Sequence, residues 1–304
     1  MVEERVTYID FAKGMVVLLM IMGHCLQPID IYPSNIIRGL IYSFHMPFFF
    51  IIAGMLKTEN HNTRMYIRKK TKRMILPFII FNILYIIANC LERANLGTDD
   101  IKKNLTNFIV YGGNSVSWFL MTLFVVEILY QEMKIKVPRQ AQWLLVLSGI
   151  AGLLLGKLRV GSIFKIGTIL TCLPIYGFAN LYKDDIKEVL VGIVRPTPNS
   201  SRLRLHPTDA EFFCLWIVAS LTMIITTGDT WELNSNYVSD IMLGLISAFS
   251  GTICVLLFSK LIVTIDNDTM KKVMGSRSQG FWTAWGSIVS VIEFIGKKSL
   301  WFYL

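Results

Sequence analysis

Long apolar runs recur along almost the whole chain, and they constrain the fold more than any other feature. The runs are roughly 16–27 residues long, with short polar stretches between them. An α-helix needs about 20 apolar residues to cross a bilayer. Composition agrees, because 53% of the 304 residues are hydrophobic and 17% are charged, against about 45–50% and about 25% in soluble domains. The sequence therefore predicts an all-α, polytopic bundle of transmembrane helices forming a single domain, residues 1–304.

The apolar runs give eight candidate spans and a weaker ninth segment. The eight are 7–28, 36–56, 74–91, 114–131, 141–156, 162–182, 212–227 and 238–264. Segment 281–296, which contains Glu293, is either a ninth span or an interfacial helix. A further apolar helix begins near Leu300, so the final helix is expected to be incomplete at Leu304. The total is about 8–10 spans.

The net charge of +9 is concentrated in alternate loops. Segment 57–73 holds seven Lys/Arg and one acidic residue, and the loops 132–140, 183–211 and 265–280 hold eleven more Lys/Arg. The loops between them on the other side hold three or fewer each. The positive-inside rule therefore places the basic loops and the N-terminus in the cytoplasm. This topology accounts for the charge, so nucleic acid is not an expected partner.

The five cysteines all lie in or at the edge of apolar runs. No two of them share the spacing of metal ligands. Small buried hydrophobic residues are the expected role of such cysteines, so neither disulfides nor a metal site is predicted.

The first apolar run carries three ionisable residues, Asp10, Lys13 and His24. At about 100° per residue they share one helical face about 60° wide. Ionisable groups inside a span are costly, and they point first to function. Asp10 and Lys13 can pair, whereas His24 lies roughly 16 Å beyond Lys13 and out of reach of Asp10. Structural roles remain open: interfacial pairing or snorkelling for Asp10 and Lys13, and a hydrogen-bonded core position for His24.

The second run, "IYSFHMPFFFIIAGML", places His45 near mid-span with Pro47 two residues later. Proline interrupts the backbone ladder and is tolerated in a membrane where other groups satisfy the freed carbonyl. Arg38 lies on the same face near the outer end. In an antiparallel hairpin, His24 and His45 would differ in depth by less than about 10 Å. A shared reaction centre is one interpretation, and a packed polar histidine at position 45 is the other.

A basic cluster, "RKKTKRMILPF", marks the cytoplasmic entrance of the third span. Lys70 and Arg73 have K-x-x-R spacing and are predicted to share one helical face. Such a cluster can fix topology, hold a lipid headgroup or bind a phosphorylated cytosolic ligand. The residues alone favour the first of these roles, in which the basic cluster fixes the membrane topology.

These motifs, in this order, resemble the acyltransferase 3 family of integral membrane acyltransferases, most closely its fucose 4-O-acetylase-like branch. The resemblance rests on "YIDFAKGMVVLLMIMGH", "IYSFHMPFFFIIAGML", "RKKTKRMILPF" and "SWFLMTLF", and more weakly on "TCLPIYGFANLYK" and "FIGKKSLWFYL". The family's R/K-x10-H signature matches Lys13 and His24, and its R-x-x-R signature is met by Lys70 and Arg73. One departure is Ala53 before Gly54, where the family usually has serine.

The resemblance implies transfer of an acyl group, often acetyl from acetyl-CoA, to a sugar hydroxyl of a surface or exported polysaccharide. It also implies a multi-pass protein of the bacterial cell membrane, with acyl-CoA, a carbohydrate acceptor and membrane lipid as partners and no metal. The competing class is a transporter or flippase for a glycan or small anion. Transporters commonly contain two related halves, and no internal repeat is visible here. A purely structural membrane subunit is the third option.

Acyl transfer to a hydroxyl needs a base and an environment that stabilises the oxyanion. His24 is the predicted base, because the unperturbed pKa of histidine is near 6.5. His45 would orient His24 or polarise the thioester carbonyl. The other predicted roles are positioning of Lys13 by Asp10, phosphate binding by Lys13, Lys70 and Arg73, and substrate binding by Arg38 and Trp118. Trp118 is alternatively an aromatic anchor at the membrane interface.

Overall fold

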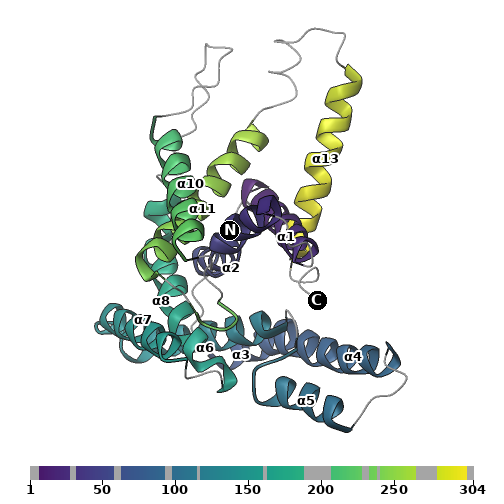
Figure 1. The fold of residues 1–304 in the computed structure, drawn as a ribbon. Helices are drawn as coiled ribbons and strands as arrows, with labels where there is room; N and C mark the ends of the chain where they lie inside the picture. The colour runs from purple at the N-terminus through teal and green to yellow at the C-terminus, as the bar shows by residue number, and fades with distance from the viewer. Residues whose placement is uncertain are drawn as a thin grey trace. The chain divides into compact units, whose positions relative to one another are not determined.

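The computed structural model describes residues 7–27, 32–57, 63–92, 98–114, 117–159, 163–187, 207–227, 233–237, 240–264 and 279–299. All the regular elements within these residues are helical (Figure 1), which confirms the all-α prediction. The helices form two compact groups. The first helix group holds α1, α10, α11, α13 and α2 up to Phe49, and the second holds α2 from Phe50 onward and helices α3 to α8.

The first helix group is built around α1. Its helices are α1 (Thr7–Leu26), α2 (Tyr32–Met55), α10 (Pro207–Thr227), α11 (Ile241–Thr264) and α13 (Gln279–Lys297). Helix α1 packs against both α13 and α11, and α10 packs along α11 (Figure 1). Phe44 on α2 meets Trp216 on α10 edge to face, with ring centroids 5.2 Å apart. Aromatic packing of this kind joins elements that lie far apart in the sequence.

Two glycines allow α13 to lie close to α1. A Cβ added at Gly14 would collide with the backbone carbonyl of Ile292, and one added at Gly296 would collide with the carbonyl of Asp10. Small residues at such crossings let helix backbones approach closely, as in many membrane helix pairs. Segment 281–296 is therefore a helix packed along α1. It is not among the five helices that meet the length and hydropathy of a membrane span.

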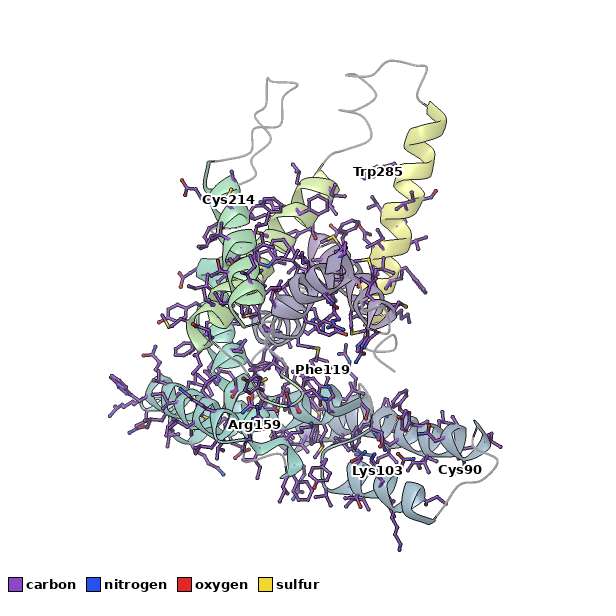
Figure 2. The ribbon with its side chains drawn as sticks, viewed as in Figure 1. Cys90, Lys103, Phe119, Arg159, Cys214 and Trp285 are labelled. Carbon is purple, nitrogen blue, oxygen red and sulfur yellow. The ribbon has the colours of Figure 1, made fainter. Side chains whose placement is uncertain are left out.

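The second helix group begins with one long helical stretch. Helix α3 (Thr63–Lys70) runs through a π-helical turn, η1 (Thr71–Ile75), into α4 (Leu76–Glu92). The other helices are α5 (Thr98–Ile109), α6 (Trp118–Lys136), α7 (Ala141–Lys157) and α8 (Ile166–Leu181), the last preceded by the short 3-10 turn η3 (Ile163–Lys165). Helix α7 packs along α8, and α6 packs against α8. Phe119, at the start of α6 (Figure 2), is 2% exposed within this core.

A short segment, 233–237, closes one end of the α7–α8 pair. Asn236 adopts a left-handed backbone conformation with φ 54°. Its side-chain amide donates to the carbonyl of Gly152 (2.7 Å) and its oxygen accepts from the Thr171 hydroxyl (2.9 Å). Asparagine tolerates this conformation better than most residues. The segment therefore satisfies polar groups that would otherwise be buried without partners.

Five described helices are long and apolar enough to cross a membrane: Thr7–Leu26, Pro33–Met55, Arg64–Leu91, Ile163–Leu181 and Ile241–Val263. Two shorter apolar helices, Ala141–Lys157 and Ala210–Thr226, coincide with two further predicted spans. The count of 8–10 spans and the cytoplasmic N-terminus remain predictions. The incomplete final helix, predicted from Leu300 onward, lies outside the described residues.

Two parts of the chain differ from the expectations for loops and cysteines. Helix α5 occupies a stretch that the hydropathy pattern leaves as a loop, because its polar face lowers its mean hydropathy below that of a span. Cys25 and Cys214 are exposed in the structure instead of buried. Both lie on apolar helices, where a membrane protein can present small hydrophobic side chains to lipid.

Candidate functional site

The face of α1 that carries Asp10, Lys13 and His24 begins with an ion pair. Lys13 Nζ lies 2.6 Å from Asp10 Oδ1, as predicted from their spacing. Asp10 is 4% exposed, and Gly296 of α13 covers its backbone. The Lys13 side chain remains 16% exposed. A buried carboxylate therefore holds the lysine in place at this end of α1.

Tyr42 connects the two intramembrane histidines. Its hydroxyl lies 3.4 Å from His24 Nδ1, and the Tyr42 and His24 ring centroids are 5.9 Å apart. On its other side the Tyr42 ring is tilted against the His45 ring, with centroids 5.0 Å apart. The structure thus links His24 on α1 with His45 on α2 through one aromatic side chain. The side chain that contacts both of them is Tyr42, which sequence reasoning did not single out.

His45 has its ring orientation fixed by its own helix. His45 Nδ1 lies 3.0 Å from the carbonyl oxygen of Ile41. A carbonyl only accepts hydrogen bonds, so Nδ1 carries the proton, and in the neutral imidazole Nε2 keeps a lone pair. A neutral His45 therefore has no second N–H with which to polarise a carbonyl. This geometry favours an orienting role for His45 over an electrophilic one. Helix α2 continues without a break through Pro47.

Arg38 lies one helical turn before Tyr42 and reaches the end of α1. Its Nη1 donates to the carbonyl oxygen of Gln27 at 3.5 Å. The guanidinium thus contacts the carbonyl that directly follows α1, at the helix end where cations are favoured. The predicted role in substrate binding is not tested by this contact.

Lys70 and Arg73 lie in different surroundings. Lys70 Nζ lies 2.5 Å from Glu127 Oε2, with the lysine and glutamate side chains 24% and 5% exposed. Arg73 is exposed. Lys70 ends α3, whereas Arg73 lies within the π-helical turn Thr71–Ile75, and a π-helix has more residues per turn than an α-helix. The shared face predicted from K-x-x-R spacing assumed regular α-helical geometry, and that assumption is wrong here.

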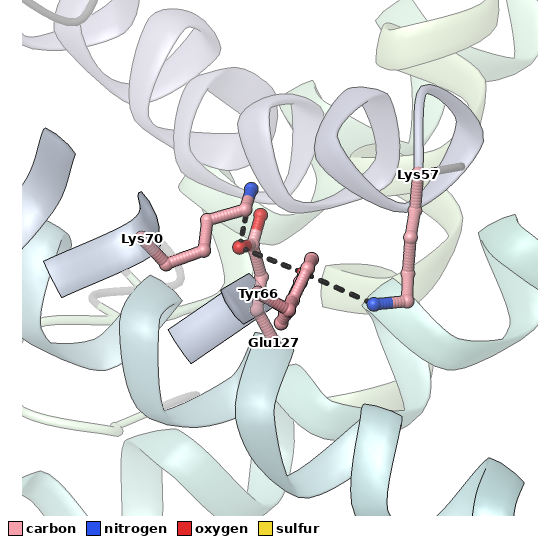
Figure 3. Close-up of polar contacts among 4 residues, drawn as sticks. All are labelled: Lys57, Tyr66, Lys70 and Glu127. Carbon is pink, nitrogen blue, oxygen red and sulfur yellow. Dashed lines mark hydrogen bonds and ion pairs between the residues drawn. The ribbon is translucent and has the colours of Figure 1, made fainter. Parts of the chain in front are cut away.

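Lys70 belongs to a cluster that also contains Lys57, Tyr66 and Glu127 (Figure 3), here called the lysine–glutamate cluster. Lys57 Nζ donates to Tyr66 Oη (3.0 Å), and Tyr66 Oη donates to Glu127 Oε2 (3.3 Å). The Lys57 ammonium also lies 4.2 Å from the Tyr66 ring centroid. One carboxylate oxygen of α6 thus contacts two residues of α3, and Tyr66 links it to Lys57 at the end of α2. The sequence showed Glu127 as a lone acid in a predicted span, a signal that could have identified it.

Lys57 follows directly after the apolar part of α2 and is 8% exposed. Burial away from water lowers its pKa to about 8, against the opposing influence of nearby Glu127. Asn180 holds this end of α2, because its side-chain amide donates to the carbonyl of Gly54 at 3.0 Å. Gly54 occupies a close approach to α8, where a Cβ would collide with the Tyr176 carbonyl. The glycine that closes the second motif therefore has a packing role.

Trp118 opens α6 and is 6% exposed. It packs edge to face on Phe119, and the Lys165 ammonium lies 5.9 Å from its ring centroid. Nearby, Asn82 accepts from the backbone N–H of Asn114 (2.7 Å) and donates to the Ser117 hydroxyl (3.0 Å). The tryptophan thus lies in a buried, hydrogen-bonded environment. Its predicted role in substrate binding is untested.

Comparison with known families decides the class of protein. The profile of a family described as an acyltransferase domain matches residues 6–304. The chain belongs to this acyltransferase 3 family. Membership in the acyltransferase 3 family, with helices long enough to span a bilayer, shows a membrane acyltransferase. Among the described residues, no group of three or more His, Cys, Asp or Glu side chains could hold a metal ion.

One curated relative adds limited support. The chain is similar to nodulation protein NolL of Mesorhizobium japonicum, with 25% identity over 151 residues. The aligned part covers 47% of this chain and 39% of the relative, so the match spans about two fifths of the length of that protein. No solved structure matches the chain. The assignment as an acyltransferase therefore rests on the family match and not on this relative.

Proposed function

We propose that this acyltransferase 3 family member moves an acyl group, acetyl in the first instance, from acyl-CoA to a sugar hydroxyl of a cell-surface or exported polysaccharide. The fucose 4-O-acetylase-like branch, an acetyl donor and a location in the bacterial cell membrane belong to the same proposal. The observation that supports it is the His24–Tyr42–His45 arrangement formed by helices α1 and α2. An imidazole at this place has the chemistry needed to take a proton from a hydroxyl group.

In the proposed reaction His24 acts as the general base. It takes the proton of the sugar hydroxyl while the sugar oxygen attacks the thioester carbonyl carbon. The new C–O bond forms, the C–S bond breaks, and the proton on His24 passes to the departing thiolate. The products are the ester and free CoA. No metal is needed to balance this step.

Two cationic sites are candidates for the phosphates of the donor, each argued within its own helix group. In the first helix group, Lys13 is positioned by Asp10 and its side chain stays partly exposed. In the second helix group, Arg73 is exposed and can make bidentate contacts with phosphate. Lys70 is paired with Glu127, so a phosphate would have to compete with that carboxylate.

The test compares cells that express the full chain, its His24→Ala variant and a matched control, His206→Ala. Acyl esters on the surface polysaccharide are released with mild alkali and measured, and isolated membranes are supplied with labelled acetyl-CoA. We expect His24→Ala to lose roughly 100-fold or more of the transfer rate, the usual contribution of a general base. Full transfer by His24→Ala would remove the base assignment. Movement of an unmodified glycan with no consumption of acyl-CoA would instead favour a transporter.

A further inference from the structure

We propose that Tyr42 is a positioning residue that selects which ring nitrogen of His24 carries the proton. This inference rests on the proposed function, since it explains how His24 becomes able to act as a base. It is carried by the contact between Tyr42 Oη and His24 Nδ1, 3.4 Å apart, and by the packing that holds the tyrosine ring in place.

Gly23 makes this contact possible. It precedes His24 on α1, and a Cβ added there would lie 2.8 Å from Cε1 of the Tyr42 ring and 3.4 Å from Cγ2 of Ile41. A Cβ contact under 3.0 Å is essentially never tolerated, because packed atoms do not approach so closely. With glycine at this position, the Tyr42 ring lies directly on α1 and its hydroxyl reaches the next residue, His24.

His45 supports Tyr42 from the other side. The Ile41 carbonyl fixes the His45 ring through Nδ1. The fixed ring lies against the ring of Tyr42, with centroids 5.0 Å apart and an interplanar angle of 36°. His45 therefore acts on His24 through the tyrosine ring between them.

The direction of the Tyr42–His24 hydrogen bond decides the chemistry of His24. A neutral imidazole has one N–H and one lone pair. If Nδ1–H donates to Tyr42 Oη, then Nε2 keeps the lone pair and can accept the proton of a substrate hydroxyl. If Tyr42 donates to Nδ1, then Nε2 carries the hydrogen and cannot act as a base. Catalysis through Nε2 therefore needs the phenol oxygen as the acceptor.

The same hydrogen bond strengthens during the reaction. Once Nε2 has taken the substrate proton, the imidazolium donates from both nitrogens. A hydrogen bond from a charged donor to the phenol oxygen is stronger than one from a neutral donor. The oxygen of Tyr42 then stabilises the charge that forms on His24. Histidines that bind metals have their tautomer set by a partner on the second nitrogen in the same way.

The test uses the full chain in membranes and in detergent, with Tyr42→Phe as the variant and Tyr85→Phe as the matched control. Phenylalanine keeps the ring packing and removes the oxygen. We expect the kcat of acyl transfer to fall roughly 10–100-fold, the range found for groups that orient metal-binding histidines, with the KM for acetyl-CoA unchanged. Tyr85→Phe keeps the wild-type kcat.

Two further measurements separate positioning from a general loss of structure. Gly23→Ala displaces the tyrosine ring without removing its hydroxyl, so we expect a similar fall in kcat and no additional fall in the double variant with Tyr42→Phe. Nitrogen NMR of ring-labelled histidine is practical because the chain has four histidines. It should show His24 protonated on Nδ1 in the wild type and on Nε2 in Tyr42→Phe.

An unchanged His24 tautomer in Tyr42→Phe, or an unchanged kcat while His24→Ala is inactive, overturns the role of Tyr42. Full activity of His24→Ala is a different result, because it removes the proposed base and leaves the tautomer measurement standing. Failure of the inference and failure of the proposed function are therefore distinguishable.

Discussion

Lys70 and Glu127 form an ion pair, with 2.5 Å between Nζ and Oε2, that joins the end of α3 to the middle of α6. Glu127 is nearly buried, and its Oε2 also accepts a hydrogen bond from Tyr66. Lys57 and Lys70 belong to the predicted basic loop 57–73, and Glu127 lies within the predicted span 114–131. Lys70, which the sequence singles out as part of a basic cluster, thus has the carboxylate of Glu127 as its partner.

Removing one partner of this pair should cost more stability than removing both. Lys70→Met leaves the Glu127 carboxylate buried without its cation, and we expect a loss of about 3 kcal/mol. Adding Glu127→Gln to Lys70→Met should recover part of that loss, because a neutral amide is less costly to bury. Thermal unfolding in detergent measures both effects. Lys72→Met, at an exposed position two residues after Lys70, is the control. An equal loss of stability in Lys70→Met and Lys72→Met would contradict the prediction.

Lys57 should make stability depend on pH in the alkaline range. Its pKa is about 8 in the folded protein because of burial, against an ordinary value of 10.5. Between these values the unfolded chain holds a proton that the folded chain has lost, so the free energy of unfolding rises with pH. Below about pH 8 both states are protonated and the dependence disappears.

The measurement is the unfolding midpoint of the wild type and of Lys57→Met between pH 7 and pH 10.5, at fixed ionic strength. We expect the wild type to gain stability relative to Lys57→Met above pH 8. Lys136→Met is the matched control, because the Lys136 side chain is 72% exposed and should leave the pH dependence unchanged. Parallel curves for wild type and Lys57→Met would show that Lys57 does not titrate in this range.

The hydropathy pattern predicted most of the fold. Each of the nine predicted apolar segments contains a helix, because burying backbone polar groups in lipid requires helical hydrogen bonding. The hydropathy pattern missed α5, because the polar face of this helix lowers its mean hydropathy below that of a membrane span. It also missed the π-helical turn at Thr71–Ile75, which depends on local backbone packing and has no periodic signature. That turn is the reason why α-helical spacing does not describe the relation of Lys70 to Arg73.

The candidate site was predictable to the extent that single helices determine it. The spacing of residues along an ideal helix predicted the Asp10–Lys13 pair and excluded direct contact of Asp10 with His24. Contacts between helices depend on rotation and crossing distance, which a single sequence does not contain. Tyr42 was missed for this reason: its contact with His24 depends on the absent side chain at Gly23. Glu127, by contrast, was visible as an acid within a span.

Lys13 should affect binding of the nucleotide part of the donor. Lys13→Met removes a cation held by Asp10, and loss of one charge-assisted hydrogen bond costs about 1.5–3 kcal/mol, which is a tenfold or greater rise in KM for acetyl-CoA. Acetyl-pantetheine carries the same thioester without the nucleotide, so its KM should not change. Lys136→Met is the control. An equal rise for both donors would mean that Lys13 acts on the structure of α1 and not on the phosphates.

Gly296 should be essential for the packing of α13 on α1. Gly296→Val places a branched side chain where the Asp10 carbonyl lies, so the helices must separate and the backbone of Asp10 loses its cover. Overpacking of this kind costs about 1–3 kcal/mol, and we expect a lower unfolding midpoint in detergent together with weaker binding of acetyl-CoA through the displaced Asp10–Lys13 pair. Ser290→Val, on the exposed side of the same helix, introduces the same side chain without the collision and should keep both properties. If Gly296→Val behaved like Ser290→Val, α13 would not depend on this close approach.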